Sequence, residues 1–164
     1  MTVRLHEDER GVSIAITHVL TIAITTTLIA GLLVGAGTVL DGEKERSGTQ
    51  SLETVGERVA GEVASVDRLA GNESGDVTLY ADHPREVSGS TYTIEVLGSD
   101  ACTNEDLIDD GVDACLRLTS HGGDVTAAVP IANETTLDTD STASGGSIAV
   151  EYDGDEISIE SDPR

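Results

Sequence analysis

The sequence predicts an α+β protein in which a long N-terminal helix precedes a small antiparallel β-sheet domain. Three observations predict this fold. An apolar segment without Asp, Glu, Lys or Arg occupies residues 11–40. Residues 52–69 then place apolar side chains at helical spacing. The remaining chain consists of short segments with alternating apolar and polar residues, separated by turn residues, which is typical of antiparallel strands.

The apolar segment is long enough to span a membrane. As a helix, residues 11–40 would extend about 45 Å, against about 30 Å of bilayer hydrocarbon. A cleaved secretory signal has a basic leader and a shorter apolar region, whereas acidic residues here outnumber Arg4 and Arg10 in the head. The sequence therefore predicts a membrane-spanning helix. Arg4 and Arg10 at one end balance Lys44 and Arg46 at the other, so the charges do not fix its orientation.

A charged break follows, and after it an amphipathic helix is expected. Its apolar stripe comprises Leu52, Val55, Val59, Val63, Val66 and Leu69. Charged residues take the other faces, namely Glu53, Glu57, Arg58, Glu62 and Asp67. Gly71 is expected to end this helix. The stripe requires a partner surface, which the later part of the chain must supply.

Four separate strands and one hairpin are predicted in that later part. They are expected at residues 76–81, 90–98, 115–120 and 125–131, and as two halves of a hairpin over 147–161. Pro130 has no N–H to donate to a neighbouring strand, so its strand is expected at an edge of the sheet. One modest core fits a chain of this length, which predicts a single folded domain.

Two hairpin registers remain open. A two-residue turn at Asp153–Gly154 would pair Val150 with Ile157. A longer loop over residues 153–156 would instead pair Tyr152 with Ile157. Both registers keep the apolar residues on one face of the sheet, so the pattern does not choose between them.

The composition is strongly acidic. The chain has 31 acidic and 9 basic residues, giving a formal net charge of −22, and it contains no Phe or Trp. Such a surface repels nucleic acid and anionic lipid. High acidity with Lys44 as the single lysine resembles proteins of extremely halophilic archaea.

The N-terminal region resembles archaeal type IV pilins and archaellins, specifically the haloarchaeal pilin-like group with a class III signal peptide. The residues that carry the resemblance are Arg10, Gly11, Val12 and Ser13, together with the apolar stretch VLTIAITTTLIAGLL that follows. The resemblance covers about the first 70 residues, and the β-domain matches only in general architecture. It implies a type IV pilin-like fold, and cleavage by a membrane-bound prepilin peptidase between Gly11 and Val12.

The resemblance also implies a domain order and a location. Residues 1–11 would form a cytoplasmic leader, 12–40 a transmembrane and assembly helix, 41–70 its amphipathic extension, and 71–164 an extracellular β-domain. The mature chain would be a single-pass protein of the cell membrane, able to enter a surface filament. Its expected partners are the prepilin peptidase, the membrane, and copies of itself or other pilin-like subunits.

Two features of the apolar helix bear on packing. Gly31 and Gly35 form a G-x-x-x-G pair, which lets helix backbones approach closely in lipid. Hydroxyls at positions 17, 21 and 25 share one face, and their commoner role is to bond to their own helix backbone. His18 is the ionisable side chain of this segment, and we expect it to lie neutral near the membrane interface.

Cys102 and Cys115 are the only cysteines. In an external domain, such a pair is expected to form a disulfide that closes the intervening loop. The alternatives are half of a zinc site, for which neither His83 nor His121 lies at ligand spacing, and a catalytic cysteine.

Asn72 and Asn133 begin the sequons NES and NET, and both are candidate glycosylation sites in predicted loops. The acids between the cysteines are Asp106, Asp109, Asp110 and Asp113. They lack the order of a calcium-binding loop. We therefore expect a solvated loop and no metal site.

The sequence is compatible with three functions: a major or minor pilin-like filament subunit for adhesion or surface attachment, a monomeric membrane-anchored domain with a binding or assembly role, and an external enzyme. A phosphate-binding glycine loop, a G-x-S-x-G turn and an H-E-x-x-H motif are missing from the sequence. No sequence motif indicates a catalytic triad of Ser and Asp with His83 or His121. The sequence favours the filament subunit, with no enzyme activity, cofactor, nucleic acid or small-molecule substrate.

Overall fold

A computed structural model describes residues 9–71, 75–103, 112–122 and 125–162, with side chains from Ala15 onward except Asp41. The chain divides into two compact units, Met1–Glu43 and Lys44–Arg164.

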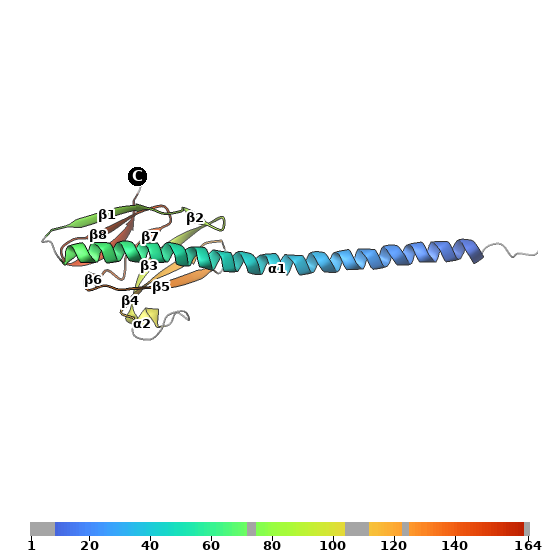
Figure 1. Ribbon diagram of the computed structural model, residues 1–164, viewed down its shortest axis with the longest axis horizontal. Coiled ribbons are helices and arrows are strands. Elements are labelled where there is room, and N and C mark those ends of the chain that lie inside the picture. Colours follow the sequence, from blue (N-terminus) through green and yellow to red (C-terminus); the bar gives the residue numbers. More distant parts are fainter. Residues whose placement is uncertain (1–8, 72–74, 104–111, 123–124, 163–164) are drawn as a thin grey trace, which may run out of the picture. The chain divides into compact units, whose positions relative to one another are not determined.

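Helix α1 extends without interruption from Glu9 to Ala70 (Figure 1). The predicted long N-terminal helix is confirmed, and the charged break, after which a second helix was expected to begin, lies inside it. Residues 43–46 are Glu, Lys, Glu and Arg, which are good helix formers, and the segment contains no proline. The charged residues of this segment therefore lie within one continuous helix and do not end it. The helix does end where expected, and the N–H of Gly71 donates to the carbonyl oxygen of Asp67 at 3.1 Å.

The described residues of the second unit form a nine-stranded sheet with the central order β1-β8-β9-β7-β3-β4-β5, while β2 pairs with β3 and β6 with β9. The strands are β1 (Val77–Asp82), β2 (Glu86–Val87), β3 (Ser90–Gly98), β4 (Ala114–Ser120), β5 (Thr126–Ile131), β6 (Thr136–Leu137), β7 (Thr142–Ser144), β8 (Ser147–Tyr152) and β9 (Glu156–Ser161). A short helix α2 (Ser99–Cys102) follows β3.

The four separate strands and the hairpin are all present, as β1, β3, β4, β5 and the β8–β9 hairpin. The short elements β2, β6, β7 and α2 were not predicted, because two to four residues are too few to show a period. The sheet is also mixed and not purely antiparallel, since β6 and β7 both pair with β9 in parallel. The chain reverses between β7 and β8 and again in the hairpin, so β9 returns in the direction of β7.

The hairpin adopts the longer of the two loops considered, because Tyr152 pairs with Ile157. The Asp153 carboxylate accepts hydrogen bonds from the backbone N–H groups of Asp155 at 3.0 Å and Glu156 at 3.1 Å. These bonds give both N–H groups an acceptor within the loop. They also hold the pKa of Asp153 below its usual value.

The edge position predicted from Pro130 is confirmed. Strand β5 lies at one end of the central strand order, and β1 lies at the other. Pro130 is paired in register with Cys115 of β4 and is exposed. A proline at this position discourages pairing with a further strand.

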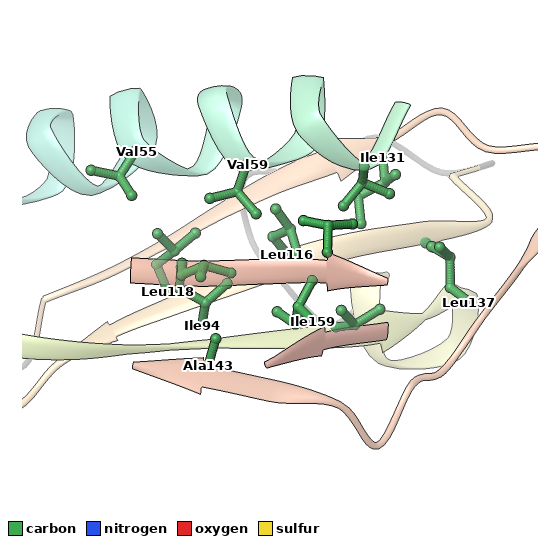
Figure 2. Packing of buried hydrophobic residues seen from close by; sticks show 14 of the residues in the cluster. Val55, Val59, Ile94, Leu116, Leu118, Ile131, Leu137, Ala143 and Ile159 are labelled. Atoms are coloured by element: carbon green, nitrogen blue, oxygen red, sulfur yellow. The ribbon is translucent and has the colours of Figure 1, made fainter. Parts of the chain in front are cut away.

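The second half of α1 packs its apolar stripe against the sheet, and Figure 2 shows Val55 and Val59 facing the side chains of the strands. The buried residues of the stripe are Leu52, Val55, Val59, Val63 and Val66. The sheet contributes buried residues that include Tyr92, Ile94, Leu116, Leu118, Ile148, Val150, Ile157 and Ile159. Leu69 was expected in the stripe but is 51% exposed. The last turn of the helix instead places Asp67 against the sheet domain.

Gly56 lies on the side of the helix that faces the sheet. A Cβ built on Gly56 would stand 2.7 Å from Val129 Cγ2 and 2.8 Å from Leu118 Cδ1. Both methyl groups belong to the sheet face under the helix, so a side chain at position 56 would hold the two layers apart.

Candidate membrane and assembly surface

The first half of α1 exposes its large apolar side chains, with exposed fractions from 53% to 72%. They are Ile16, Val19, Leu20, Ile22, Ile24, Leu28, Ile29, Leu32, Leu33, Val34, Val39 and Leu40. An apolar surface that surrounds a helix on all sides is stable only when lipid or other protein covers it.

This segment meets the length and composition requirements for crossing a membrane. Among the described residues, one helix is long and apolar enough to cross a membrane. Its most apolar 18-residue stretch has a mean hydropathy of 2.2, and none of that stretch is buried within the protein. The sequence prediction of a membrane-spanning helix thus corresponds to a real, continuous helix in the structure. By its length and composition, this helix is suited to anchor the chain in a membrane with a single pass.

Gly31 and Gly35 lie on this exposed part of α1, where a Cβ added to either would meet nothing within 4 Å. A glycine inside a helix costs about 1 kcal/mol relative to alanine. At Gly56 the missing side chain admits the sheet. At Gly31 and Gly35, no described part of the chain makes use of the space.

The hydroxyl groups on this part of the helix bond to the helix itself, as expected. Thr21 Oγ1 donates to the carbonyl oxygen of Thr17 and Thr25 Oγ1 to that of Thr21, both at 2.8 Å. These polar groups are therefore satisfied within the helix and can enter lipid without an unpaired donor. His18 is exposed on the same segment.

The proposed leader cleavage site lies at the beginning of α1. The helix begins at Glu9, so Arg10, Gly11 and Val12 belong to its first turns. Their side chains lie outside the described part of the structure, and cleavage between Gly11 and Val12 stays a prediction.

Cys102 and Cys115 form a disulfide, with an S–S distance of 2.07 Å and a Cα–Cα distance of 5.9 Å. Both residues are buried, and the bond joins α2 to β4. This is the pairing expected from the sequence.

The loop closed by the disulfide contains Asp106, Asp109 and Asp110, all of which lie outside the described residues. Asp113 is described and exposed. Within the described ranges, no group of three or more His, Cys, Asp or Glu side chains is arranged to hold a metal ion.

Of the two sequons, Asn72 lies outside the described residues and Asn133 is half-buried. The Nδ2 atom of Asn133 donates a hydrogen bond to the carbonyl oxygen of Thr135 at 2.8 Å. This is the nitrogen that would carry a glycan, so glycosylation of the folded chain would first have to break this bond.

Asp67 was expected on an outer face of the helix, but it is buried. Its carboxylate accepts the backbone N–H of Glu134 at 3.0 Å and that of Thr135 at 2.8 Å. Burial by itself raises the pKa of Asp67. The hydrogen bonds from Thr135 and Glu134 and the charge of Arg68 outweigh burial, so the pKa of Asp67 is lower than usual. The helix dipole disfavours an acid at the C-terminal end of a helix. The position of Asp67 could therefore have suggested that hydrogen-bond donors from elsewhere in the chain stabilise its carboxylate.

The two histidines considered for catalysis have other partners. His83 Nε2 lies 2.9 Å from Glu62 Oε2, and the His83 side chain is fully buried. His121 Nε2 lies 2.7 Å from Thr93 Oγ1 on the sheet. The first contact links the β1–β2 connection to α1, and the second links the end of β4 to β3. Both contacts join neighbouring elements of the fold.

A family model described as "Family of unknown function (DUF7266)" matches residues 7–161 of this chain. The match includes both the apolar helix and the sheet domain. Comparisons with curated proteins and with solved structures gave no match.

Proposed function

The chain belongs to the DUF7266 family, whose function is unknown, and from this premise we propose that it is a pilin-like structural subunit of an archaeal type IV pilus-type filament. The subunit, major or minor, would serve adhesion or surface attachment. The observation that carries the proposal is the uninterrupted helix α1. One half of it is apolar and exposed, and the other half has a single stripe buried under a sheet domain.

Such a helix supports two successive uses. A single-pass anchor needs about 20 apolar residues. In the membrane, lipid would cover the exposed side chains of the first half. In a filament, the same side chains would be covered by copies of the helix, and the open backbone at Gly31 and Gly35 would admit close approach.

The proposed path to the surface begins in the cytoplasmic leader. A prepilin peptidase would cut after Gly11, and the retained helix would hold the chain in the membrane with the sheet domain outside. The Cys102–Cys115 disulfide supports an external sheet domain, because such bonds persist in oxidising surroundings. We propose a structural role for this domain, without catalysis or a resident cofactor.

A second candidate is a monomeric membrane-anchored external domain. One observation favours it: lipid by itself can cover all the exposed apolar side chains of α1, since the threonine hydroxyls are already satisfied within the helix. Both candidates share the anchor and differ in whether copies associate.

Shearing of the native cell surface separates the two candidates. Filaments released by shear and purified by density should contain this chain, identified by mass spectrometry, if it is a filament subunit. A membrane protein of unrelated fold serves as the control for vesicle contamination. Recovery of the chain only with membranes, in cells that do release filaments, would contradict the filament proposal and favour the anchored monomer.

A further inference from the structure

Strand β1 is an open edge of the sheet. It pairs with β8 from Val77 to Asp82 and ends the central strand order (Figure 1). Among the described residues, no strand pairs with its other side. Natural sheets usually block such an edge with proline, lysine or a bulge. Pro130 does so on β5, the strand at the opposite edge, whereas the residues of β1 before Asp82 are uncharged and include no proline.

The hydrophobic core is covered less completely at β1 than at β5. Val77, Leu79 and Ala81 face the core side of the sheet, and all three are only half-buried. The residues of β5 that face the same side are Ala127, Val129 and Ile131, and all three are buried. Apolar side chains that are partly exposed along an open edge gain burial when a further strand pairs there.

The outer face of β1 carries an exposed aromatic side chain. Tyr80 is 56% exposed, whereas Tyr92, an aromatic residue of β3, is buried. Thr78 and Asp82 lie on the same face as Tyr80 and are also exposed. In antiparallel sheets, an aromatic residue opposite a β-branched residue stabilises the pair. A strand that places threonine opposite Tyr80 would therefore suit this edge.

We propose that β1 pairs with β1 of a second copy of the chain, in antiparallel orientation about a two-fold axis at Leu79. The sequence DVTLYAD over residues 76–82 has similar chemistry in both directions. In this register Leu79 lies opposite its own counterpart, Val77 opposite Ala81, and Thr78 opposite Tyr80. Each apolar residue on the core side thus meets another, and the favourable threonine–tyrosine pair forms twice.

The neighbouring register, with its axis at Tyr80, fits less well. It would pair Thr78 with Asp82, and it would place Val77 opposite His83. The His83 side chain is fully buried in the connection after β1, so Val77 would lack an apolar partner. A slip by one residue would set core-side residues opposite outer-face residues. The axis at Leu79 therefore gives the best match.

Charge makes this contact dependent on salt. In the proposed register, Asp76 of one copy faces Asp82 of the other at both ends of the paired strands, and like charges directly opposite each other are destabilising. Each copy also carries a formal net charge of −22. Salt screens both repulsions. The paired strands are short, so a single contact is weak, and many copies on one filament would bind together much more tightly.

The symmetry of the pair indicates which copies associate. A two-fold axis perpendicular to the joined sheet reverses every direction that lies along it. Figure 2 shows α1 running along the sheet face, so the sheet-packed stretches of α1 in the two copies would run in opposite directions. Copies anchored in one membrane, or stacked head to tail in one filament, share a direction. The contact therefore joins subunits of two facing surfaces or two filaments, and it rests on the proposed function for this adhesive setting.

Disulfide trapping tests the contact and its register in the full-length chain, in detergent micelles at high salt. Thr78→Cys copies mixed with Tyr80→Cys copies should form a cross-link between the two positions on mild oxidation, because the Cα atoms of paired residues lie about 4.5–5.5 Å apart. Each variant alone should cross-link about tenfold less. Thr126→Cys, at the exposed start of β5, is the matched control and should stay monomeric. A dominant homodimer of the Tyr80 variant, or an equal yield at position 126, would overturn the inference.

Charge changes provide the second test, with self-association in micelles measured by sedimentation equilibrium. Tyr80→Glu should weaken association about tenfold, because it removes the aromatic pair and adds opposing acids. Thr126→Glu places the same charge on the other edge strand and should have little effect. Asp76→Asn should strengthen association at low salt, and this gain should shrink as salt is added. Asp113→Asn, at another exposed position, is its control. Equal effects of the variants and their controls would contradict a specific pairing.

The combined outcomes separate this contact from the filament proposal. Sheared filaments that contain the chain, with no cross-link between positions 78 and 80 in micelles, would reject the β1 contact and leave the filament proposal standing. The cross-link, together with released filaments that lack the chain, would do the reverse. When the chain is found in filaments and the cross-link forms, Tyr80→Glu should enter filaments at the normal level and reduce their bundling. Unchanged bundling would reject the contact between filaments.

Discussion

The carboxylate of Asp67 accepts the backbone N–H of Thr135 at 2.8 Å, and this contact ties the last turn of α1 to the loop between β5 and β6. The neighbouring N–H of Glu134 is held by the other carboxylate oxygen at 3.0 Å. The helix and the loop are far apart in sequence. These two charge-assisted hydrogen bonds therefore fix the position of the end of α1 on the sheet domain, which burial of the apolar stripe does only nonspecifically.

Asp67→Asn should lower the free energy of unfolding of the sheet domain by about 2 kcal/mol at neutral pH, since the amide has one acceptor oxygen where the carboxylate has two, and it carries no charge. The measurement is urea unfolding of the full chain, followed by the near-UV signal of its tyrosines. Glu57→Gln, on the exposed side of the same helix, is the matched control and should change stability little.

The same pair of proteins gives a pH prediction. The folded pKa of Asp67 is lowered from its usual value of 3.8. Its contribution is therefore fully present above the unfolded pKa and is lost as pH falls through the folded pKa. The stability difference between wild type and Asp67→Asn should be constant near pH 7 and shrink below about pH 4. A difference that grows on acidification would contradict the clamp.

Gly56→Ala and Gly61→Ala should change stability in opposite directions. Alanine at position 56 would collide with Val129 and Leu118, and overpacking of this kind costs about 1–3 kcal/mol, more than the gain in helix propensity. Alanine at position 61 meets nothing within 4 Å and should stabilise the helix by up to about 1 kcal/mol. Unfolding midpoints of the two variants, measured side by side, check the prediction.

If the leader is cleaved between Gly11 and Val12, the mature protein begins Val12-Ser13-Ile14. Intact-mass measurement of the native membrane protein should find this start, and Gly11→Leu should leave the leader attached. A mature chain that retains residues 1–10 would reject the pilin-like assignment.

Loss of the disulfide in the double variant Cys102→Ser, Cys115→Ser should cost about 3 kcal/mol, if the loop-entropy account of disulfide stabilisation holds. Non-reducing peptide mapping of the wild-type protein should show one peptide that links the two positions. Free thiols on protein recovered from the cell surface would argue against an external domain.

Gly31→Leu and Gly35→Leu distinguish a packed helix from a lipid-covered one. Both should preserve membrane insertion, since leucine is apolar and favours helix. Filament incorporation should be lost, because close backbone approach is blocked. Gly37→Leu lies on another side of the helix and is the matched control. Normal incorporation of the Gly31 and Gly35 variants would favour the anchored monomer.

Periodic segments were predictable from the sequence. The stripe from Leu52 to Val66, the strand over residues 90–98 and the edge position of Pro130 each follow from a local pattern that the structure retains. These predictions succeeded because the period of each local pattern matches the geometry of the helix or strand that contains it, so that its apolar residues lie on one buried face.

Features that depend on contacts distant in sequence could not be predicted in this way. The burial of Asp67 depends on a loop 68 residues later in the chain. The parallel pairing of β7 with β9 depends on where the hairpin inserts, which no local pattern encodes. The hairpin register was settled by Asp153 bonding to its own loop, since both registers buried the same face.

The disulfide has a consequence for cleavage of the chain by a protease. A single peptide-bond cut anywhere between Cys102 and Cys115 would leave two fragments that stay covalently joined. Strands β3 and β4 pair along seven residue positions next to that bond, so the nicked domain would also keep its hydrogen-bonded sheet. A chain cleaved between these two cysteines would therefore stay in one piece and migrate as one species until it is reduced.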